Sequence, residues 1–375
     1  MKAINSPYIR FANISNSGFC IYNFLVNKFQ SIKKEYIDVM FACVTPQTIT
    51  DLENRFGVKL ISQMRKSFLL LDPDEMWKMH RVSTMEIETS TVCNWRCEYC
   101  PVKSDTREKK FIEFKLFEQL IQKAREYKCI KEIGIHSFNE PSLDPNFHRY
   151  SDMIFDSGFK FLIFTNGSML DEKNIKNLSR FKERLTIVFN FPSISKDKFN
   201  KMTGSNSYER SCEALRLSFL YGITTHINVQ GIGADRENEA RKVFAAFPKA
   251  KMISYDSSDR GGAVKNKKYF NHIDLTDDRM RGCYTLTRSI YVTVDGHLDM
   301  CCNDYGKKYL IGDIRSSTID EALSGESACE ARKKVWGALP AEKSFLCRSC
   351  ILMKESFEEE VYLTFDSYTK KVLHL

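Results

Sequence analysis

The sequence predicts an α/β protein built on a partial (βα)6 TIM-like barrel, with a small N-terminal α+β, winged-helix-like domain and a cysteine-rich C-terminal domain. Three observations support this fold class. Six strand-like segments alternate with amphipathic helical ones in the middle of the chain, a strand pair with helical patterns precedes them, and clustered cysteines follow them. The expected domains are residues 1–83, 84–257 and 258–375.

Length and composition exclude several classes of protein. The 375 residues, 43% hydrophobic and 28% charged, are typical of a globular chain with one large core and smaller appendages. No window reaches the roughly 18 apolar residues of a membrane span. The N-terminal stretch MKAINSPYIRF lacks the apolar region of a secretory signal, so a cytoplasmic location is expected. The net charge of +8 is dispersed, which favours neither a membrane nor a nucleic acid as partner.

The first 83 residues carry the pattern of a small separate unit. Residues 19–26 and 29–32 flank the polar pair Asn27-Lys28 and predict a hairpin. Three short helical patterns follow. One of them is expected to begin at Thr45-Pro46, with Thr45 as its cap and Pro46 in its first turn. Residues 69–71 predict a returning strand.

The central region carries the barrel pattern. The expected strands are residues 84–89, 131–136, 159–164, 185–190, 224–230 and 250–255. Between them lie helical segments such as 112–127, which places Phe114, Phe117, Leu120, Ile121 and Ala124 on one side. Alternating βα units pair in parallel with right-handed crossovers. A doubly wound Rossmann-like domain is the alternative, but no GxGxxG follows the first strand.

A first group among the thirteen cysteines follows the first predicted strand. Cys93, Cys97 and Cys100 lie on one loop, at the end of the barrel where such folds place their active sites. Three thiolates can bind three corners of a 4Fe-4S cube and leave the fourth iron open to a substrate or cofactor. Zinc is the alternative, but it usually takes four ligands, and no fourth Cys or His lies close by in sequence.

This C-x3-C-x2-C pattern, with Tyr99 before the last cysteine, resembles the radical S-adenosylmethionine (radical SAM) superfamily. The resemblance implies a 4Fe-4S cluster that binds SAM, its reductive cleavage to a 5′-deoxyadenosyl radical, and abstraction of a substrate hydrogen. It also implies a reductant such as flavodoxin or ferredoxin. The residues it assigns to cofactor binding are Tyr99, Asn139, Glu140, Pro141, Thr165, Asn166, Asn190 and Arg260.

These assignments rest on short matches at strand ends. Glu140 and Pro141 fit the family's Gly-Gly-Glu-Pro segment, which binds the amino group of SAM, whereas Phe138 and Asn139 replace its glycines. Residues 165–167 resemble the family's TNG turn, and Asn190 ends the fourth strand, where relatives contact the ribose. Arg260 follows the sixth strand and is either a ligand of the SAM or substrate carboxylate or a solvated loop residue.

A second group of cysteines lies near the C-terminus, around strands expected at 290–294 and 298–300 with a turn at Asp295-Gly296. Its spacing resembles the SPASM and twitch domains of radical SAM enzymes. The resemblance implies one auxiliary 4Fe-4S cluster bound by Cys283, Cys301, Cys347 and Cys350. A structural zinc at the same four residues is the alternative. Cys302 is a candidate catalytic residue that could supply a hydrogen atom, replace a ligand, or merely pack.

Three functions are consistent with these patterns. The first is modification of a ribosomally synthesised peptide by epimerisation, cross-linking or dehydrogenation, since many peptide-maturing relatives carry a winged-helix-like domain that binds a leader peptide as an edge strand. The second is a twitch-type dehydrogenase or epimerase that acts on a sugar or aminocyclitol, suggested by the cysteine spacing. The third is a non-catalytic metal-binding protein. The expected substrate is therefore a peptide or a small molecule.

Overall fold

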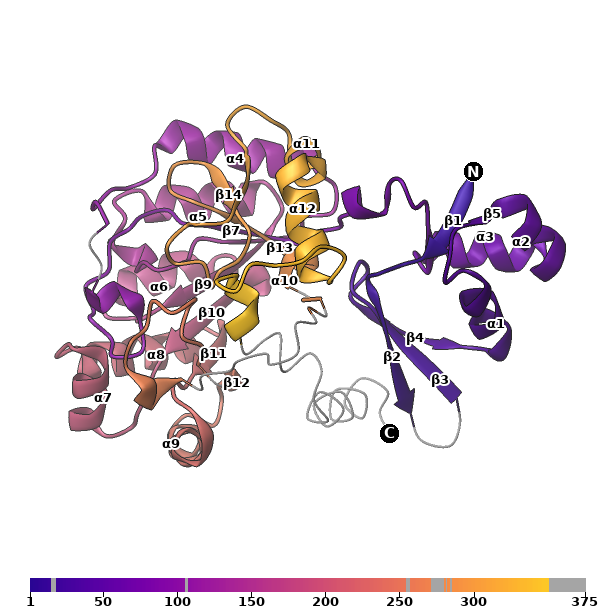
Figure 1. Cartoon of the computed structure of the whole chain (residues 1–375). Helices are drawn as coiled ribbons and strands as arrows, with labels where there is room; N and C mark the ends of the chain where they lie inside the picture. Colours follow the sequence, from indigo (N-terminus) through magenta and orange to yellow (C-terminus); the bar gives the residue numbers. More distant parts are fainter. Residues whose placement is uncertain are drawn as a thin grey trace.

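The computed structural model describes residues 1–14, 18–104, 107–253, 257–270, 280, 282–283 and 285–350. The end of the predicted strand 250–255 and the chain after residue 350 lie outside them. A small N-terminal unit stands beside a larger body that contains an open, mainly parallel sheet (Figure 1). In the described part of the chain, no helix has the length and apolar character needed to cross a membrane.

The N-terminal unit consists of two small antiparallel sheets and three helices. One sheet has the order β5-β1-β6 and the other the order β2-β3-β4. The elements are β1 (Lys2–Asn5), β2 (Ile9–Ile14), β3 (Gly18–Asn23), β4 (Lys28–Ile32), α1 (Lys34–Ala42), β5 (Gln47–Thr48), α2 (Ile49–Phe56), α3 (Val58–Lys66) and β6 (Leu70–Leu71). The predicted hairpin is confirmed as β3–β4, in which Asn23 pairs with Lys28 and Asn27 adopts a φ of 51° in the turn. The returning strand is confirmed as β6.

The predicted helix start at Thr45-Pro46 is wrong. The helix α2 begins at Ile49, and Thr48 caps it by accepting a hydrogen bond from the backbone N–H of Asp51. The cause is a contact with a segment that is distant in sequence. Residues 47–48 pair with β1 as a short strand, so the helix cannot begin before that strand ends.

The larger body confirms the six predicted strands. They are β7 (Thr84–Ile87), β8 (Glu132–Gly134), β9 (Lys160–Thr165), β10 (Leu185–Asn190), β11 (Thr224–Asn228) and β12 (Lys251–Ile253), and each is parallel to its neighbours among these six. The crossovers contain α4 (Phe114–Glu126), α5 (Phe147–Asp156), α6 (Glu172–Ser179), α7 (Lys196–Thr203), α8 (Tyr208–Leu220) and α9 (Gly233–Ala246). Short 3-10 turns complete the connections: η1 (Met76–Lys78), η2 (Pro101–Ser104), η3 (Pro141–Leu143), η4 (Lys182–Arg184) and η5 (Lys267–Tyr269).

The two faces of the sheet differ in polarity. Met85, Ile133, Phe161 and Leu185 are register partners on four neighbouring strands, and all are buried on the apolar face. Because side chains alternate along a strand, the other face collects the residues in between. Its polar members include Glu86, His136, Asn190 and Asn228. The sequence thus places an apolar layer on one side and polar groups on the inner side of the curved sheet.

The C-terminal region continues the same sheet. Its elements are α10 (Thr285–Arg288), β13 (Ser289–Val292), β14 (His297–Asp299), β15 (Leu310–Asp313), α11 (Ile319–Ser324), α12 (Glu326–Val335) and η6 (Leu346–Ser349). β13 lies parallel to β7, and β14 and β15 follow antiparallel. The predicted turn at Asp295-Gly296 is confirmed. A Cβ at Gly296 would lie 2.7 Å from the Arg315 side chain, and its φ is 83°, so both space and conformation favour glycine there.

The N-terminal unit packs against the end of α12 through aromatic rings. The Tyr8 ring lies edge-on to Trp336 with centroids 5.0 Å apart and edge-on to Trp77 with centroids 6.0 Å apart. Beneath these rings, the buried Arg332 donates from Nε to the Trp77 carbonyl at 2.8 Å. In Figure 1 the indigo N-terminal unit accordingly faces the yellow helix α12.

His80, in the connection between the two parts, makes stability depend on pH. Its Nδ1 lies 2.9 Å from the Tyr127 hydroxyl, and its Nε2 lies 3.7 Å from Asp320. Burial, reinforced by the charge of Arg332, lowers the pKa of His80 from 6.5 to about 4. The unfolded chain therefore binds a proton between pH 6.5 and 4 that the folded chain does not, and stability falls as pH decreases through this window.

Between the two ends of this pH window, the contribution of His80 changes the free energy of unfolding by up to about 3 kcal/mol. We expect His80→Gln to remove that change. The measurement is urea unfolding of wild type and variant at pH 7.5, 6, 5 and 4. The difference between the two unfolding free energies should change across the window and be constant above it. Parallel curves for the two proteins would contradict this role of His80.

Candidate active site

The first cysteine group lies on a loop that follows β7 and is fastened to α7. The backbone N–H of Arg96 donates to the Thr203 carbonyl at 3.0 Å, and that of Glu98 donates to the Met202 carbonyl at 2.9 Å. Trp95 is buried edge-on against Phe199 with ring centroids 5.3 Å apart. The loop that carries Cys93, Cys97 and Cys100 therefore has a fixed path although it contains little regular structure.

Gly204 allows this close approach of loop and helix. It has a φ of 60°, and a Cβ there would lie 2.7 Å from the Arg96 carbonyl oxygen. We expect Gly204→Ala to displace the loop and to lower the iron content after anaerobic reconstitution. Gly158→Ala is the matched control, because Gly158 also has a positive φ of 83° but has open space around it. Both variants carry the cost of about 1 kcal/mol for a left-handed alanine, so equal iron content in the two would contradict the steric role.

The three thiols interact with one another electrostatically. Burial raises the pKa of Cys93 to about 12, with further contributions from the charges of Glu140 and Cys100. Burial and the charges of Cys100 and Cys93 raise the pKa of Cys97 well above its usual value, and Tyr99 lies against this thiol. Three thiolates crowded together in a buried place call for a bound cation or cluster to compensate their charge.

Three cysteine thiols form a donor set that fits a 4Fe-4S cluster. Within the described residues, no trio of His, Cys, Asp or Glu side chains converges closely enough to hold one ion. The thiolates of a 4Fe-4S cluster bind different irons at separate corners, so they need proximity without convergence. Cys93, Cys97 and Cys100 meet that requirement.

Glu140 is the centre of a buried polar network at the ends of β8 and β9. Its carboxylate accepts hydrogen bonds from Thr165 Oγ1 at 2.6 Å and from the backbone N–H of Asn166 at 2.7 Å. It also accepts from both the backbone N–H and the hydroxyl of Ser142, in the turn η3 that begins at Pro141. Burial raises the pKa of Glu140, and these donors act in the opposite direction. The backbone N–H of Glu140 donates to the Val92 carbonyl, which ties the network to the cysteine loop.

Asn94 connects the cysteine loop to the same network, and the sequence analysis missed it. Its Oδ1 accepts from Asn166 Nδ2 at 2.8 Å, while its Nδ2 donates to Ser168 Oγ at 2.9 Å. The backbone carbonyl of Asn166 accepts from Ser211 on α8 at 2.8 Å. The position of Asn94 between Cys93 and Cys97 could have marked it as a candidate site residue. Its hydrogen-bond partners could not be predicted from the sequence, because they come from other segments of the chain.

Two more of the predicted cofactor residues, Asn139 and Asn190, lie near the ends of strands β8 and β10. Asn139 accepts from the backbone N–H of Ser137 and donates to Thr89 and Ser90, which holds two strand ends together. Asn190 lies on the inner face, where it accepts from Asn228 on β11 at 3.2 Å. The structure thus places Asn190 at the carboxyl end of its strand, as the sequence predicted.

Arg260 lies beside the second cysteine group. Its Nη1 donates to Asn303 Oδ1 at 2.6 Å, and Ser258 donates to the same oxygen at 3.0 Å. The guanidinium also lies 5.8 Å from the centre of the Phe138 ring, at the position where the family has a glycine. Arg260 therefore connects the loop after β12 to the loop after β14.

The four predicted auxiliary cysteines lie near one another, and two of them contact Asn303. The backbone N–H of Asn303 lies 3.4 Å from Cys301 Sγ, and its Nδ2 lies 3.5 Å from Cys350 Sγ. Burial and the charges of Cys350 and Cys283 raise the pKa of Cys347 well above its usual value. The thiols thus lie near one another although their elements are far apart in sequence. All thirteen cysteines fall within the described residues and are free thiols.

Cys302 lies between this group and the inner face of the sheet. A hydrogen bond from Cys301 lowers the pKa of Cys302 to about 7, and Tyr291 and Arg260 act in the same direction. Tyr291 is on β13 and is the register partner of Glu86 on β7. The structure thus places Cys302 near the predicted ligands Cys301 and Cys283 and near Tyr291 and Glu86 of the inner face.

A carboxylate–imidazole pair occupies the inner face, and the sequence analysis missed it as well. Glu86 Oε2 lies 3.2 Å from His136 Nε2, and the His136 ring packs on Phe164 with centroids 4.3 Å apart. His136 is 9% exposed, and within the described structure its Nδ1 has no hydrogen-bond partner. The pair therefore places a carboxylate and an imidazole side by side on the inner face of the sheet.

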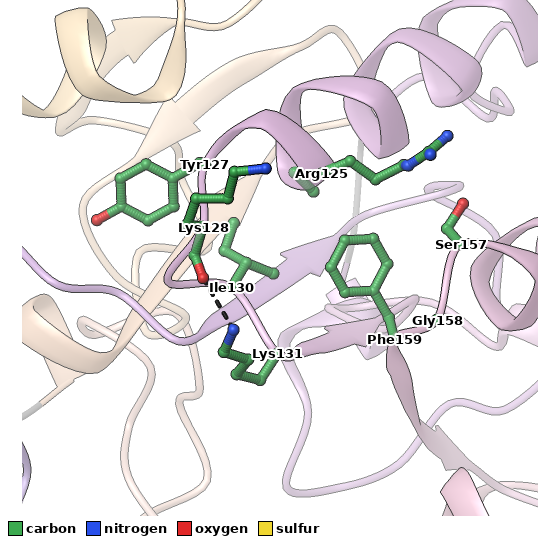
Figure 2. Close-up of a pocket in the computed structure, with 9 residues that line it drawn as sticks. Arg125, Tyr127, Lys128, Ile130, Lys131, Ser157, Gly158 and Phe159 are labelled. Atoms are coloured by element: carbon green, nitrogen blue, oxygen red, sulfur yellow. Dashed lines mark hydrogen bonds between the residues drawn. The ribbon is translucent and has the colours of Figure 1, made fainter.

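A separate cavity of about 270 Å³ lies at the opposite end of the barrel. Figure 2 shows Lys128 and Lys131 at its edge, where Lys131 Nζ donates to the Lys128 carbonyl at 2.9 Å. Its lining comes from the end of α4 and from the residues before β8 and β9. This cavity is therefore distinct from the cysteine loop, which follows the carboxyl end of β7.

Comparisons with known proteins agree with this arrangement. Residues 87–245 match the model of the radical SAM superfamily, and residues 283–351 match that of an iron-sulfur cluster-binding domain, SPASM. The S-adenosyl-L-methionine-dependent 2-deoxy-scyllo-inosamine dehydrogenase of Niallia circulans is 23% identical over 286 residues, which are 74% of this chain and 96% of that enzyme.

Solved structures of similar fold include the two that follow. Streptococcus suis SuiB bound to its precursor peptide SuiA gives a TM-score of 0.58 at 13% identity, and the match covers 94% of each chain. A structure of anSMEcpe with bound AdoMet gives a TM-score of 0.53 at 16% identity and covers 68% of this chain and 80% of that one.

Proposed function

Because the chain belongs to the radical SAM superfamily and carries a C-terminal SPASM-type iron–sulfur domain, we propose that it modifies a ribosomally synthesised peptide. The observation that carries this proposal is the N-terminal unit. One of its two three-stranded sheets, β2-β3-β4, has two outer strands, β2 and β4, that pair with no further strand among the described residues. An extended leader peptide can add to such an edge, because its backbone satisfies the open N–H and C=O groups. The likeness to peptide-bound SuiB, which spans this unit as well, supports the proposal.

The site residues have separate roles in this proposal. When bound, the SAM-binding 4Fe-4S cluster supplies the electron that cleaves SAM to a 5′-deoxyadenosyl radical. Cys93, Cys97 and Cys100 hold that cluster, while Glu140 and Asn166 shape the pocket for the methionine end of SAM. The inner face of the sheet holds the substrate side chain away from water.

The second cysteine group is assigned to one auxiliary 4Fe-4S cluster bound by Cys283, Cys301, Cys347 and Cys350. We expect about eight irons per chain after anaerobic reconstitution. In a variant with Cys93, Cys97 and Cys100 replaced by alanine, about four should remain. Iron and acid-labile sulfide analysis measures both. A reconstituted wild type with about four irons, or a triple variant with none, would contradict the auxiliary cluster.

A second candidate is a dehydrogenase that acts on an aminocyclitol or sugar. It is favoured by the relative from Niallia circulans, of which the match covers 96%. With all four thiolates supplied by protein, the proposed auxiliary cluster suits electron transfer, and removal of a second electron is what a dehydrogenation requires. In this reading the N-terminal unit is a structural cap.

The test is a parallel turnover experiment with the reconstituted full-length chain, SAM and dithionite. One arm contains precursor peptides encoded in neighbouring reading frames, and the other contains 2-deoxy-scyllo-inosamine. We expect substrate-dependent 5′-deoxyadenosine together with a peptide that has lost two hydrogens or, in D2O, has gained one deuterium. Oxidation of the aminocyclitol without any change in the peptides would overturn the proposal in favour of the second candidate.

A further inference from the structure

Trp336, which follows α12, lies between the N-terminal unit and the loop that leads to Cys283. Its indole packs edge-on against Tyr8, with centroids 5.0 Å apart, and against Phe24 at 6.2 Å. It also lies against Gly282, the residue immediately before Cys283. One side chain thus contacts two parts of the molecule that are distant in sequence.

The contact between Trp336 and the Cys283 loop leaves no free space. The backbone N–H of Gly282 donates to the Val335 carbonyl at 2.7 Å, and a Cβ on Gly282 would lie 2.6 Å from Trp336 Nε1. One residue further along, a Cβ on Gly337 would lie 2.5 Å from the Met280 carbonyl oxygen. Two backbones that approach this closely must move together, because no flexible side chain lies between them.

The contact on the N-terminal side is equally constrained. Tyr8 is fully buried, and its hydroxyl donates to the Met76 carbonyl at 3.1 Å. Trp77, next in the chain, packs on Tyr8 and accepts a hydrogen bond from the buried Arg332 of α12. A shift of the N-terminal unit therefore displaces the end of α12 instead of being absorbed by loose packing.

We propose that Trp336 is a positioning residue that couples the N-terminal unit to the auxiliary iron–sulfur centre by fixing the loop that carries Cys283. The inference rests on the proposed assignment of Cys283 as a ligand. Its consequence is that a peptide bound to the N-terminal unit shifts the reduction equilibrium of the auxiliary centre. By thermodynamic linkage, reduction of the centre then changes the peptide affinity by the same factor.

The first test needs no iron. In the full-length apo protein, pulsed alkylation followed by mass spectrometry measures the labelling rate of individual cysteines. Tyr8→Ala removes the closer of the two N-terminal aromatic contacts of Trp336 and leaves that of Phe24 in place. We expect about fivefold faster labelling of Cys283, the factor that corresponds to the loss of one aromatic pair. Trp336→Ala should have the same effect, whereas Trp336→Phe keeps a ring in place and should restore the slow rate.

Two cysteines and one variant serve as controls. Cys43 lies in the N-terminal core and reports unfolding of that unit, and Cys347 reports disruption of the cysteine group as a whole. Phe56→Leu perturbs the N-terminal core at a residue in α2, away from Trp336. Faster labelling of Cys283 alone supports the proposal. Unchanged labelling of Cys283 in Tyr8→Ala overturns it, as does equal acceleration at Cys43 and Cys347.

The second test measures the redox and spectroscopic properties of the auxiliary cluster. In a background with Cys93, Cys97 and Cys100 replaced by alanine, we expect Tyr8→Ala to shift the midpoint potential and the EPR g values of the reduced auxiliary cluster, and Phe56→Leu to leave both unchanged. Identical spectra and potentials in the Tyr8→Ala and parent proteins overturn the coupling. A background protein without iron would refute the ligand assignment instead, and the labelling result would then decide the coupling by itself.

Discussion

Replacement of Cys97 by alanine is expected to abolish formation of 5′-deoxyadenosine from SAM and to remove about four irons per chain. Cys97 is buried, and its charge interacts with both Cys93 and Cys100, so it is the thiol most enclosed by the site. The loop is held to α7 by backbone hydrogen bonds through Arg96 and Glu98, which prevents another thiol from taking its place. Two thiolates alone leave a cluster labile.

The measurement is chromatography of 5′-deoxyadenosine after anaerobic incubation with SAM and dithionite, alongside iron analysis. Cys129→Ala is the matched control, because Cys129 is a half-buried free thiol in a turn after α4. The control should retain wild-type iron and cleavage. Wild-type cleavage by Cys97→Ala would refute the assignment of the site.

Glu140→Gln is expected to have the second-largest effect. The Glu140 carboxylate accepts hydrogen bonds on both oxygens, from Thr165, Asn166 and Ser142. A glutamine amide accepts on one oxygen only and would turn its N–H2 group toward the remaining donors. Each buried donor left without an acceptor costs about 1–3 kcal/mol, so we expect a loss of about 3 kcal/mol in the free energy of unfolding, together with loss of SAM cleavage.

Urea unfolding of the apo protein and equilibrium dialysis with SAM separate the two effects of Glu140→Gln. The control is Glu132→Gln, which removes a half-buried carboxylate at the opposite end of the barrel, where burial raises the pKa of Glu132. The control should unfold within about 1 kcal/mol of wild type and bind SAM normally. Unfolding of Glu140→Gln at the wild-type urea concentration would show that the hydrogen-bond network contributes little.

The sequence predicted the fold best for elements whose buried face follows directly from the spacing of apolar residues. Buried strands with an apolar face, such as β10, and the helix α4 with its stripe of Phe117, Leu120 and Ile121, were predicted with nearly the observed bounds. The two cysteine groups were predicted because the spacing of cysteine ligands can be recognised in the sequence itself.

Other features depend on which strands and helices become neighbours, which no local pattern encodes. The pair Glu86 and His136 forms only because β7 and β8 are adjacent and in a particular register. The start of α2 depends on pairing with β1, at the other end of the N-terminal unit. Trp336 acquires its partners from three separate segments of the chain.

The shared sheet has a consequence for how such proteins can be recombined. β13, which leads toward the second cysteine group, is hydrogen-bonded along β7, which leads into the first. A chain cut after residue 257 would expose the whole edge of β7 and with it a template for aggregation. The two cysteine-bearing parts therefore share one hydrogen-bonded sheet, and a boundary drawn between them opens a strand edge.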